Sequence, residues 1–389
     1  MRILIYSFLL CICILRLDAQ IAKIPFELED DLMFVKVKIN DDPNERIFVF
    51  DTGATSDLLD TKVAEDLGLE ANFRQSATGA GGTKDYDIVL SQKLTLSNNI
   101  TVENTHLVLS DLTRLRSSGR NFVGIIGYSL LKDYITKIDY DNNEILLFDK
   151  IENVATKGYK AIPFKFGSGL PIPQFDIRIT LRNGDSFTGR VFFDSGAALA
   201  LLINTPFNKE NNLSKKVEKS LISKSQNLHG ESTSEKIAIK SMNIGGYELG
   251  EMAVNIAHDK NGVSSYKNYL GILGGEVISK FNIILDYSTS ILYLKPNSNF
   301  NKSFEFPVSG IYLRKSKGTI IVYQVEKTSP AYKLGIRKGD QLIAVNNDNS
   351  GNIQVYKNYL RKENSTVSLT ILDIEGKTKK VTLKLERLL

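Results

Sequence analysis

The sequence has no tryptophan, three histidines and only two cysteines among its 389 residues. Both cysteines, Cys11 and Cys13, lie in an apolar stretch near the N-terminus, so the chain beyond residue 19 has no thiol for disulfides or nucleophilic catalysis. The histidines, His106, His229 and His258, are scattered and form no His-x-x-x-His motif. We therefore expect no metal and no other cofactor.

Two further motifs are missing. A serine hydrolase would have a Gly-x-Ser-x-Gly elbow, which the sequence lacks, and no segment combines aromatic and basic residues as a nucleic-acid platform does. We therefore expect no nucleic-acid partner. With 42% hydrophobic and 24% charged residues, the composition is that of a globular protein long enough for two or three domains.

The N-terminus resembles a secretory signal. Residues 1–19 contain Arg2, an apolar run from Ile3 to Leu15 and the small residue Ala19. A run of about 13 apolar residues is shorter than the roughly 20 that cross a bilayer. We expect cleavage after Ala19 and a periplasmic or extracellular protein. A retained membrane anchor is the alternative, and a lipid anchor is disfavoured because no small residue precedes Cys11 or Cys13.

One motif occurs twice: an apolar run ends in Asp, a hydroxyl residue, Gly and a small residue. The copies are residues 48–55, with Asp51, and residues 191–198, with Asp194. Each run predicts a buried strand, and the glycine permits a tight turn after it. A single copy is typical of an ordinary turn. Two matching loops supply the two carboxylates that acid–base catalysis by a proton-sharing pair requires.

The segments after the two copies also match in order and spacing. Gly124 follows Asp51 by 73 positions, and Gly271 follows Asp194 by 77. Each glycine opens an apolar-apolar-Gly segment, which a short helix, an Asp-Tyr pair and an apolar strand follow in both halves. This self-similarity predicts an internal duplication.

On these motifs, residues 22–296 resemble the retropepsin-like and pepsin-like aspartic peptidases, whose two halves each have an Asp-[Thr/Ser]-Gly loop and a later apolar-apolar-Gly segment. The resemblance implies an all-β fold with two closed lobes of six or seven strands and a cleft between them. The lobes would span residues 20–158 and 159–298. It also implies a monomer with an intramolecular pair of catalytic residues, Asp51 and Asp194, that hydrolyses a peptide or protein substrate.

The same resemblance assigns supporting residues. Thr52 and Ser195 would brace the two loops through their hydroxyls, and Gly53 and Gly196 would donate backbone amides to the carboxylates. In residues 78–83, the three glycines Gly79, Gly81 and Gly82 would form the tip of a flap over the cleft. A flexible loop without this role is the alternative. The corresponding loop of the second half, residues 227–231, lacks a glycine cluster, so we expect the halves to differ functionally.

The residue after each catalytic glycine is unusual for pepsin-like enzymes. These often have Ser or Thr there, whereas this chain has Ala54 and Ala197. Without a hydroxyl donor, the ionised carboxylate is less stabilised, so the pKa values of the pair should be higher. We expect an activity optimum at weakly acidic to neutral pH.

Residues 329–340 contain the string Ser-Pro-Ala-x-x-x-Gly-Ile-x-x-Gly-Asp. On this string, residues 304–389 are similar to a PDZ domain of the kind fused to bacterial extracytoplasmic peptidases. It implies a loop for a peptide's C-terminal carboxylate at residues 309–313, with Gly310, Ile311, Tyr312 and Leu313, beside a helix that includes residues 356–360. A domain used only for packing is the alternative.

The distribution of charge along the chain agrees with separate roles for the peptidase-like and the PDZ-like regions. Residues 301–389 hold 16 basic and 8 acidic residues, while the whole chain has a net charge of +5, so the expected PDZ region is the positive part and favours anionic peptide ends. The sequence thus predicts a secreted aspartic endopeptidase. The alternative is a secreted protein that binds peptides in the cleft and the PDZ groove without cutting them.

Overall fold

The computed structural model describes residues 20–79, 82–96, 100–116, 119–228 and 230–389. The expected signal peptide and Gly81 therefore lie outside the described residues. The chain is mostly β, as expected, with few and short helices. Among the described residues, no helix has the length and apolar character needed to cross a membrane.

The first half of the chain forms an eight-stranded sheet. Its order is β2-β3-β4-β9-β5-β8-β7-β6, and an additional pairing of β3 with β7 closes six of the strands into a ring. We call this sheet the first barrel. Its strands are β2 (Glu27–Glu29), β3 (Leu32–Ile39), β4 (Arg46–Phe50), β5 (Asp57–Asp60), β6 (Phe73–Gly79), β7 (Gly82–Thr95), β8 (Thr101–Ser110) and β9 (Gly124–Ile126).

The second half repeats this pairing pattern. The path β14-β15-β21-β16-β20-β18 closes through β14 and β18, while β13, β17 and β19 extend it. We call this sheet the second barrel. Its strands are β13 (Lys165–Gly167), β14 (Leu170–Leu181), β15 (Ser186–Phe193), β16 (Leu201–Ile203), β17 (Ser220–Asn227), β18 (Gly230–Ile244), β19 (Tyr247–Leu249), β20 (Met252–Ala257) and β21 (Gly271–Leu273). Both barrels therefore close with six strands.

A third, antiparallel sheet joins the two halves. Its order is β1-β11-β10-β22-β23-β12, and the pairing of β10 with β22 places Ile138 opposite Ile283. Its strands are β1 (Gln20–Pro25), β10 (Ile135–Asp139), β11 (Glu144–Phe148), β12 (Lys160–Pro163), β22 (Phe281–Asp286) and β23 (Ile291–Pro296). One continuous apolar core runs through both barrels and this joint sheet, so we refer to the three together as the body.

The C-terminal part is a five-stranded sheet with its own core. The order is β24-β25-β26-β27-β28, which leaves β24 at an edge beside helix α7. Its elements are β24 (Ile311–Ser316), β25 (Thr319–Val325), α6 (Pro330–Lys333), β26 (Gln341–Val345), α7 (Ile353–Arg361), β27 (Thr366–Leu372) and β28 (Thr378–Lys384). Ser329 caps α6 by accepting from the Tyr332 amide.

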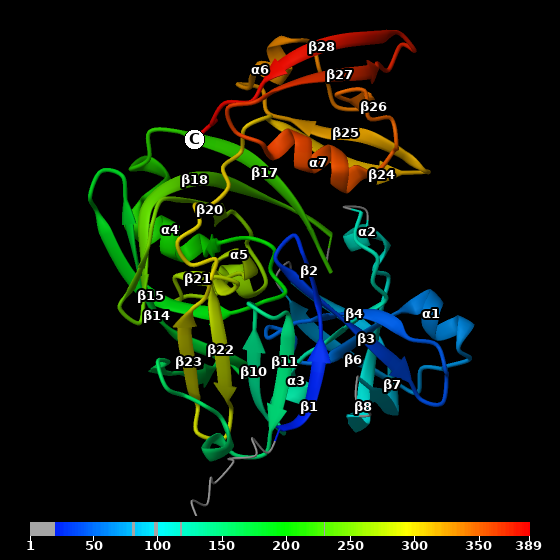
Figure 1. The fold of residues 1–389 in the computed structure, drawn as a ribbon, viewed down its shortest axis with the longest axis vertical. Helices are drawn as coiled ribbons and strands as arrows, with labels where there is room; N and C mark the ends of the chain where they lie inside the picture. The colour runs from blue at the N-terminus through cyan, green and yellow to red at the C-terminus, as the bar shows by residue number, and fades with distance from the viewer. Residues whose placement is uncertain (1–19, 80–81, 97–99, 117–118, 229) are drawn as a thin grey trace, which may run out of the picture.

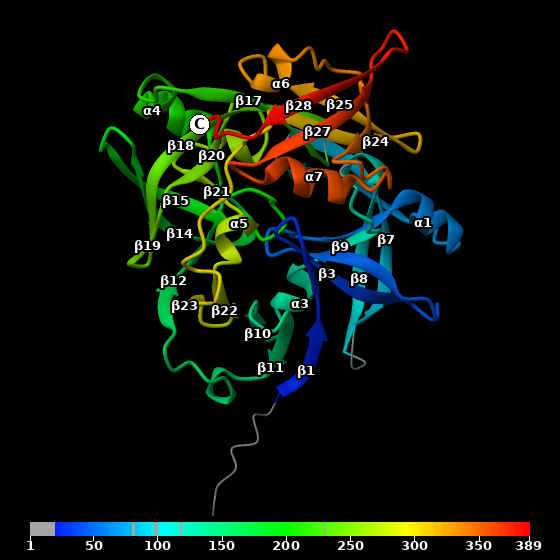
Figure 2. The ribbon, with the colours of Figure 1, turned by 45° about the horizontal axis from the view of Figure 1, so that its top comes forward.

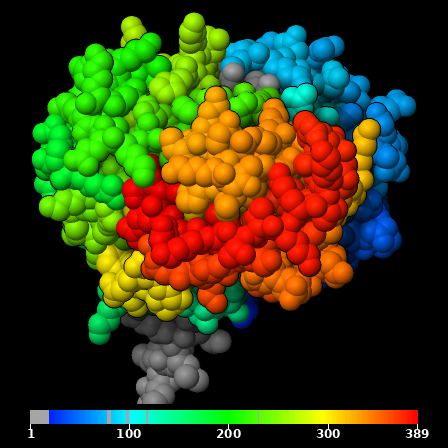
Figure 3. Space-filling view, turned by 90° about the horizontal axis from the view of Figure 1, so that it is seen from above, coloured from blue at the N-terminus to red at the C-terminus, as the bar shows by residue number. Residues whose placement is uncertain are grey.

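This C-terminal part lies across both halves of the body. From β25, the Tyr323 hydroxyl and the Gln324 amide donate to backbone carbonyls of β17 in the second barrel. From α7, Arg361 pairs with Asp30 in the β2–β3 turn of the first barrel. Figures 1 and 2 show it above the barrels, and Figure 3 shows its orange and red atoms between the green second barrel and the blue first barrel.

The body also contains short helices. They are α1 (Thr61–Asp66), α2 (Thr113–Arg116), α3 (Tyr128–Leu131), α4 (Thr205–Asn211) and α5 (Gly275–Ile278), with 3-10 turns at Ile151–Asn153, Leu213–Lys215 and Val263–Ser265. At the start of α1, the Asp60 carboxylate caps the helix by accepting from the Lys62 amide. β17 follows the second 3-10 turn and pairs along its whole length with β18.

Candidate active site

The two Asp loops meet at the centre of the body. Asp51 directly follows β4, and its amide donates to the carbonyl of Ile126 in β9 at 2.9 Å. Asp194 directly follows β15, and its amide donates to the carbonyl of Leu273 in β21 at 3.0 Å. β9 and β21 run parallel to β4 and β15. The two apolar-apolar-Gly segments therefore hold the two Asp loops at equivalent strand ends.

A reciprocal set of hydrogen bonds braces the loops against each other. The Thr52 hydroxyl donates to the Phe193 carbonyl at 3.0 Å and accepts from the Ser195 amide at 2.9 Å. In return, the Ser195 hydroxyl donates to the Phe50 carbonyl at 3.4 Å and accepts from the Thr52 amide at 3.0 Å. Both side chains are buried, at 1% and 0% exposure. We call these four bonds the loop brace.

The loop brace brings the two carboxyl groups together. The Gly53 amide donates to Asp51 at 2.7 Å, and the Gly196 amide donates to both Asp51, at 3.1 Å, and Asp194, at 3.0 Å. A methyl group on Gly53 would lie 2.5 Å from Cγ of Asp194, and one on Gly196 would lie 2.3 Å from Cγ of Asp51. Only glycine at both positions leaves room for the carboxyls.

Burial raises the pKa of both carboxyl groups. Burial raises the pKa of Asp194 well above its usual range, and the charge of Asp51 and a hydrogen bond to Asp51 raise it further. Burial also raises the pKa of Asp51, while hydrogen bonds from Gly53, Asp194 and Gly196 lower it. The charge on one carboxyl raises the pKa of the other, so the two groups titrate as a coupled pair. Such a pair can supply an acid beside a base.

The glycine-rich segment forms a hairpin. β6 and β7 pair antiparallel, with Gly79 opposite Gly82, while Gly81 lies outside the described residues. Tyr86 of β7 is buried in the apolar cluster that includes Ala54 of the first Asp loop. Tyr86 does not stand out in the sequence, where its only signal is an aromatic residue a few positions after the glycines.

The comparisons with known proteins agree with this geometry. A family model for aspartyl protease matches residues 35–130, which include the first Asp loop, and a PDZ domain model matches residues 321–373. The chain contains an aspartyl protease domain and a PDZ domain. The second Asp loop and residues 309–313 lie outside the matched spans. A search of curated proteins found no match.

The hairpin of β17 and β18 in the second barrel reaches the aspartyl protease domain. Leu228 at its tip packs against the apolar cluster of the first barrel, and α2 lies beside β17; Figure 1 shows this approach. The hairpin occupies the place expected for a second flap, although His229 lies outside the described residues. Both hairpins contact this cluster, and the second also accepts hydrogen bonds from Tyr323 and Gln324 of the PDZ domain.

The predicted carboxylate loop of the PDZ domain borders a cavity. Gly310 has φ +68°, a conformation that favours glycine, and Ile311 and Leu313 are buried while Tyr312 is half-buried. Residues 309–313 line one wall of a cavity of about 670 Å³ together with Leu360 of α7. The structure thus brings the predicted loop and helix together, but around a space that the body also borders.

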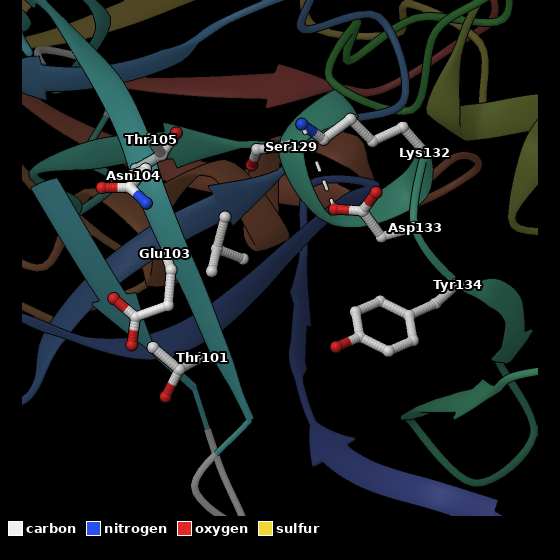
Figure 4. A pocket seen from close by; sticks show the side chains of 9 residues that line it. Thr101, Glu103, Asn104, Thr105, Ser129, Lys132, Asp133 and Tyr134 are labelled. Atoms are coloured by element: carbon white, nitrogen blue, oxygen red, sulfur yellow. Dashed lines mark ion pairs between the residues drawn. The ribbon is translucent and has the colours of Figure 1, made fainter. Parts of the chain in front are cut away.

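A second pocket, of about 270 Å³, lies between β8 and the segment that begins with α3 (Figure 4). Neither Asp51 nor Asp194 lines it. Two of its residues, Thr105 and Ser129, donate to the buried carboxylate of Asp57 at 2.6 and 2.7 Å. Asp57 also accepts from the Gly127 amide at 3.4 Å. No motif in the sequence points to Asp57, which anchors the segment that holds the first Asp loop.

No group of three or more His, Cys, Asp or Glu side chains that could hold a metal ion occurs in the described part of the chain.

We predict that Gly196→Ala abolishes most of any peptidase activity. A methyl group would collide with the Asp51 carboxylate, and displacing a catalytic group by about 1 Å costs on the order of 100-fold in rate. Gly250→Ala is the matched control, because no atom lies within 4 Å of the added methyl group. The measurement is the cleavage rate of a peptide; equal rates for the two variants would contradict the prediction.

We predict that Thr52→Val destabilises the body by about 2–4 kcal/mol, because the Ser195 amide and the Phe193 carbonyl each lose a buried partner worth about 1–3 kcal/mol. Thr180→Val, which removes an exposed hydroxyl bonded to Ser186, should change stability by less than about 0.5 kcal/mol. Calorimetry and far-ultraviolet circular dichroism would follow unfolding, since no tryptophan is present. Similar losses for both variants would refute the role of the loop brace.

We predict that Asp194→Asn stabilises the protein more at pH 8 than at pH 3. The folded-state pKa of Asp194 lies above its unfolded value, so this carboxyl costs no stability below the unfolded pKa and costs most above the folded one. Asparagine removes that cost. Melting temperatures across this pH range, compared with those of the exposed-site variant Asp176→Asn, test the sign; a larger gain at pH 3 would show that it is wrong.

Proposed function

We propose that the protein is an exported aspartic endopeptidase that hydrolyses peptide bonds with a water molecule activated by Asp51 and Asp194. The observation that carries this proposal is the loop brace, which holds two carboxyl groups so close that both accept from the Gly196 amide. The match of residues 35–130 to aspartyl protease supports it at the level of the family.

The two carboxyl groups take different roles. Ionised Asp51 accepts a proton from a water molecule bound between the two side chains, and the water oxygen attacks the scissile carbonyl carbon. Protonated Asp194 donates a hydrogen bond to the carbonyl oxygen, where negative charge develops. The proton taken up by Asp51 then passes to the leaving amine. Protein residues supply every proton transfer, and both carboxyls come from one chain, so a monomer suffices.

The other parts of the molecule serve this reaction. The hairpin of β6 and β7 would cover the bound peptide, since its residue Tyr86 belongs to the same buried apolar cluster as Ala54 of the first Asp loop. The PDZ domain would bind the C-terminal end of a peptide at residues 309–313, beside α7. We place the mature protein in the periplasm or outside the cell, on the basis of the signal-like residues 1–19.

The decisive experiment uses the mature protein, residues 20–389, with Asp51→Asn, Asp194→Asn and the control Asp176→Asn. Each is incubated with a diverse peptide library, and cleavage is read by mass spectrometry. We expect the wild type and the control to cut, and both active-site variants to lose about 10³-fold or more in rate. Peptide binding without cleavage by the wild type at every pH from 3 to 8 would instead favour a binding protein.

We predict a bell-shaped pH profile with its maximum at weakly acidic to neutral pH. Activity should rise as Asp51 loses its proton and fall as Asp194 loses its own, and both pKa values are raised. Ala54 and Ala197 contribute no hydroxyl that would lower them. The measurement is the rate with one peptide across the pH range; a maximum near pH 2 would contradict the prediction.

A further inference from the structure

The cavity of about 670 Å³ separates the PDZ domain from the body. Residues 309–313 of the predicted carboxylate loop and Lys357, Leu360 and Arg361 of α7 form its PDZ wall. The β2–β3 turn and α5 contribute to its body wall. The volume falls within the range of about 300–1,000 Å³ that is usual for ligand pockets. The cavity is thus large enough for the last residues of a peptide, but the body closes one side of it.

A carboxylate of the body already lies beside the basic residues of α7. Asp30, in the β2–β3 turn, is 2.8 Å from Arg361 and 3.5 Å from Lys357, and 3.4 Å from Arg120 of the first barrel. Its side chain is only 9% exposed. Asp30 and Asp31 have φ values of +47° and +63°, a conformation that costs energy for residues other than glycine. The ion pairs compensate that cost.

The electrostatics show how strongly these cations bind a carboxylate. Although burial alone would raise it, the charges of Arg361, Lys357 and Arg120 lower the pKa of Asp30 to about 2. The same turn is joined to α7 a second time, because Gln354 donates to Glu29. The turn therefore lies along the groove helix as a bound acidic segment would.

The cavity can accept more negative charge than the body supplies. Six basic side chains line it against four acidic ones, Asp30, Asp31, Glu276 and Glu305. Burial and the nearby Asp31 raise the pKa of Glu276 to about 7, and burial and Asp30 raise that of Asp31. These two acids are therefore more readily protonated than usual, although burial also lowers the pKa of three of the basic residues, Lys236, Lys280 and Lys357. Charge complementarity favours an anionic ligand.

We propose that this cavity binds the C-terminal end of an acidic peptide, whose side-chain carboxylate replaces Asp30 beside Arg361 and Lys357. The terminal carboxylate would accept from backbone amides of residues 309–313, and an apolar last side chain would lie against Leu360. This inference rests on the proposed peptide recognition by the PDZ domain and names its ligand. Asp30 is then an internal competitor, which lowers the apparent affinity of the peptide.

The test measures binding in the double variant Asp51→Asn/Asp194→Asn of the mature protein, so that turnover plays no part. The probe is a fluorescein-labelled peptide that ends in Glu-Asp-Val-Leu, followed by fluorescence polarisation. Two comparison peptides have the same length: one is amidated at its C-terminus, and one has lysine in place of both acidic residues. We expect both comparison peptides to bind about tenfold or more weakly.

Two substitutions should change affinity in opposite directions. Asp30→Asn removes the competitor and should tighten binding of the acidic peptide about tenfold, whereas Arg361→Gln removes its main partner and should weaken binding about tenfold. Misfolding could not produce both changes. Asp176→Asn and Arg190→Gln, which alter an exposed pair 3.8 Å apart on β14 and β15, are the matched controls and should leave the affinity unchanged.

The outcomes separate this inference from the function on which it rests. Equal binding of the lysine-containing peptide, or no gain in affinity from Asp30→Asn, would overturn the acidic-peptide inference while peptide recognition by the PDZ domain stands. If no peptide with a free C-terminus binds any variant, that recognition fails as well. Cleavage by the wild type, measured separately, decides the endopeptidase proposal independently of both.

Discussion

The loop brace is the interaction on which the rest of the body depends. Two buried carboxyl groups in contact repel each other when both are ionised, so they stay together only if the backbone that carries them cannot move apart. Thr52 and Ser195 provide this constraint, because each hydroxyl satisfies a carbonyl and an amide of the opposite loop. Neither loop can shift without leaving buried polar groups of the other unpaired.

The surrounding architecture serves to make that brace rigid. Asp51 and Asp194 each follow a buried strand whose parallel neighbour also bonds the Asp amide. The joint sheet ties the two barrels together below the loops, and its pairing of β10 with β22 extends one apolar core across both halves. Two barrels joined only by the contact of their Asp loops would depend on four hydrogen bonds. The shared sheet and the continuous core add many further contacts that hold the two barrels together.

The PDZ domain adds a second connection between the barrels. It holds the β17 strand of one barrel and the β2–β3 turn of the other. The carbonyl of Asp31 in that turn packs against Gly275, where a methyl group would lie 2.4 Å from it and 3.3 Å from the Ser195 carbonyl. The charged contact at α7 is therefore only a few residues from the second Asp loop. The cavity beside α7 and the two Asp loops are therefore joined by one continuous set of contacts.

The β class, the two Asp loops, the glycine-rich hairpin and the PDZ helices can be predicted from the sequence, because each depends on a local pattern of apolar spacing, turn residues and caps. The supporting roles of Thr, Ser and Gly in the loops followed from the resemblance to aspartic peptidases. Contacts between segments that are distant in the sequence became known only from the folded structure. No local pattern predicts that β10 and β22 pair in one sheet, that Tyr86 and Asp57 are buried, or that Leu228 contacts the first barrel. The same holds for Asp30, because an Asp-Asp turn is ordinary in a sequence. Asp30 pairs with Arg361 of α7 only because folding brings residues about 330 positions apart within hydrogen-bond reach.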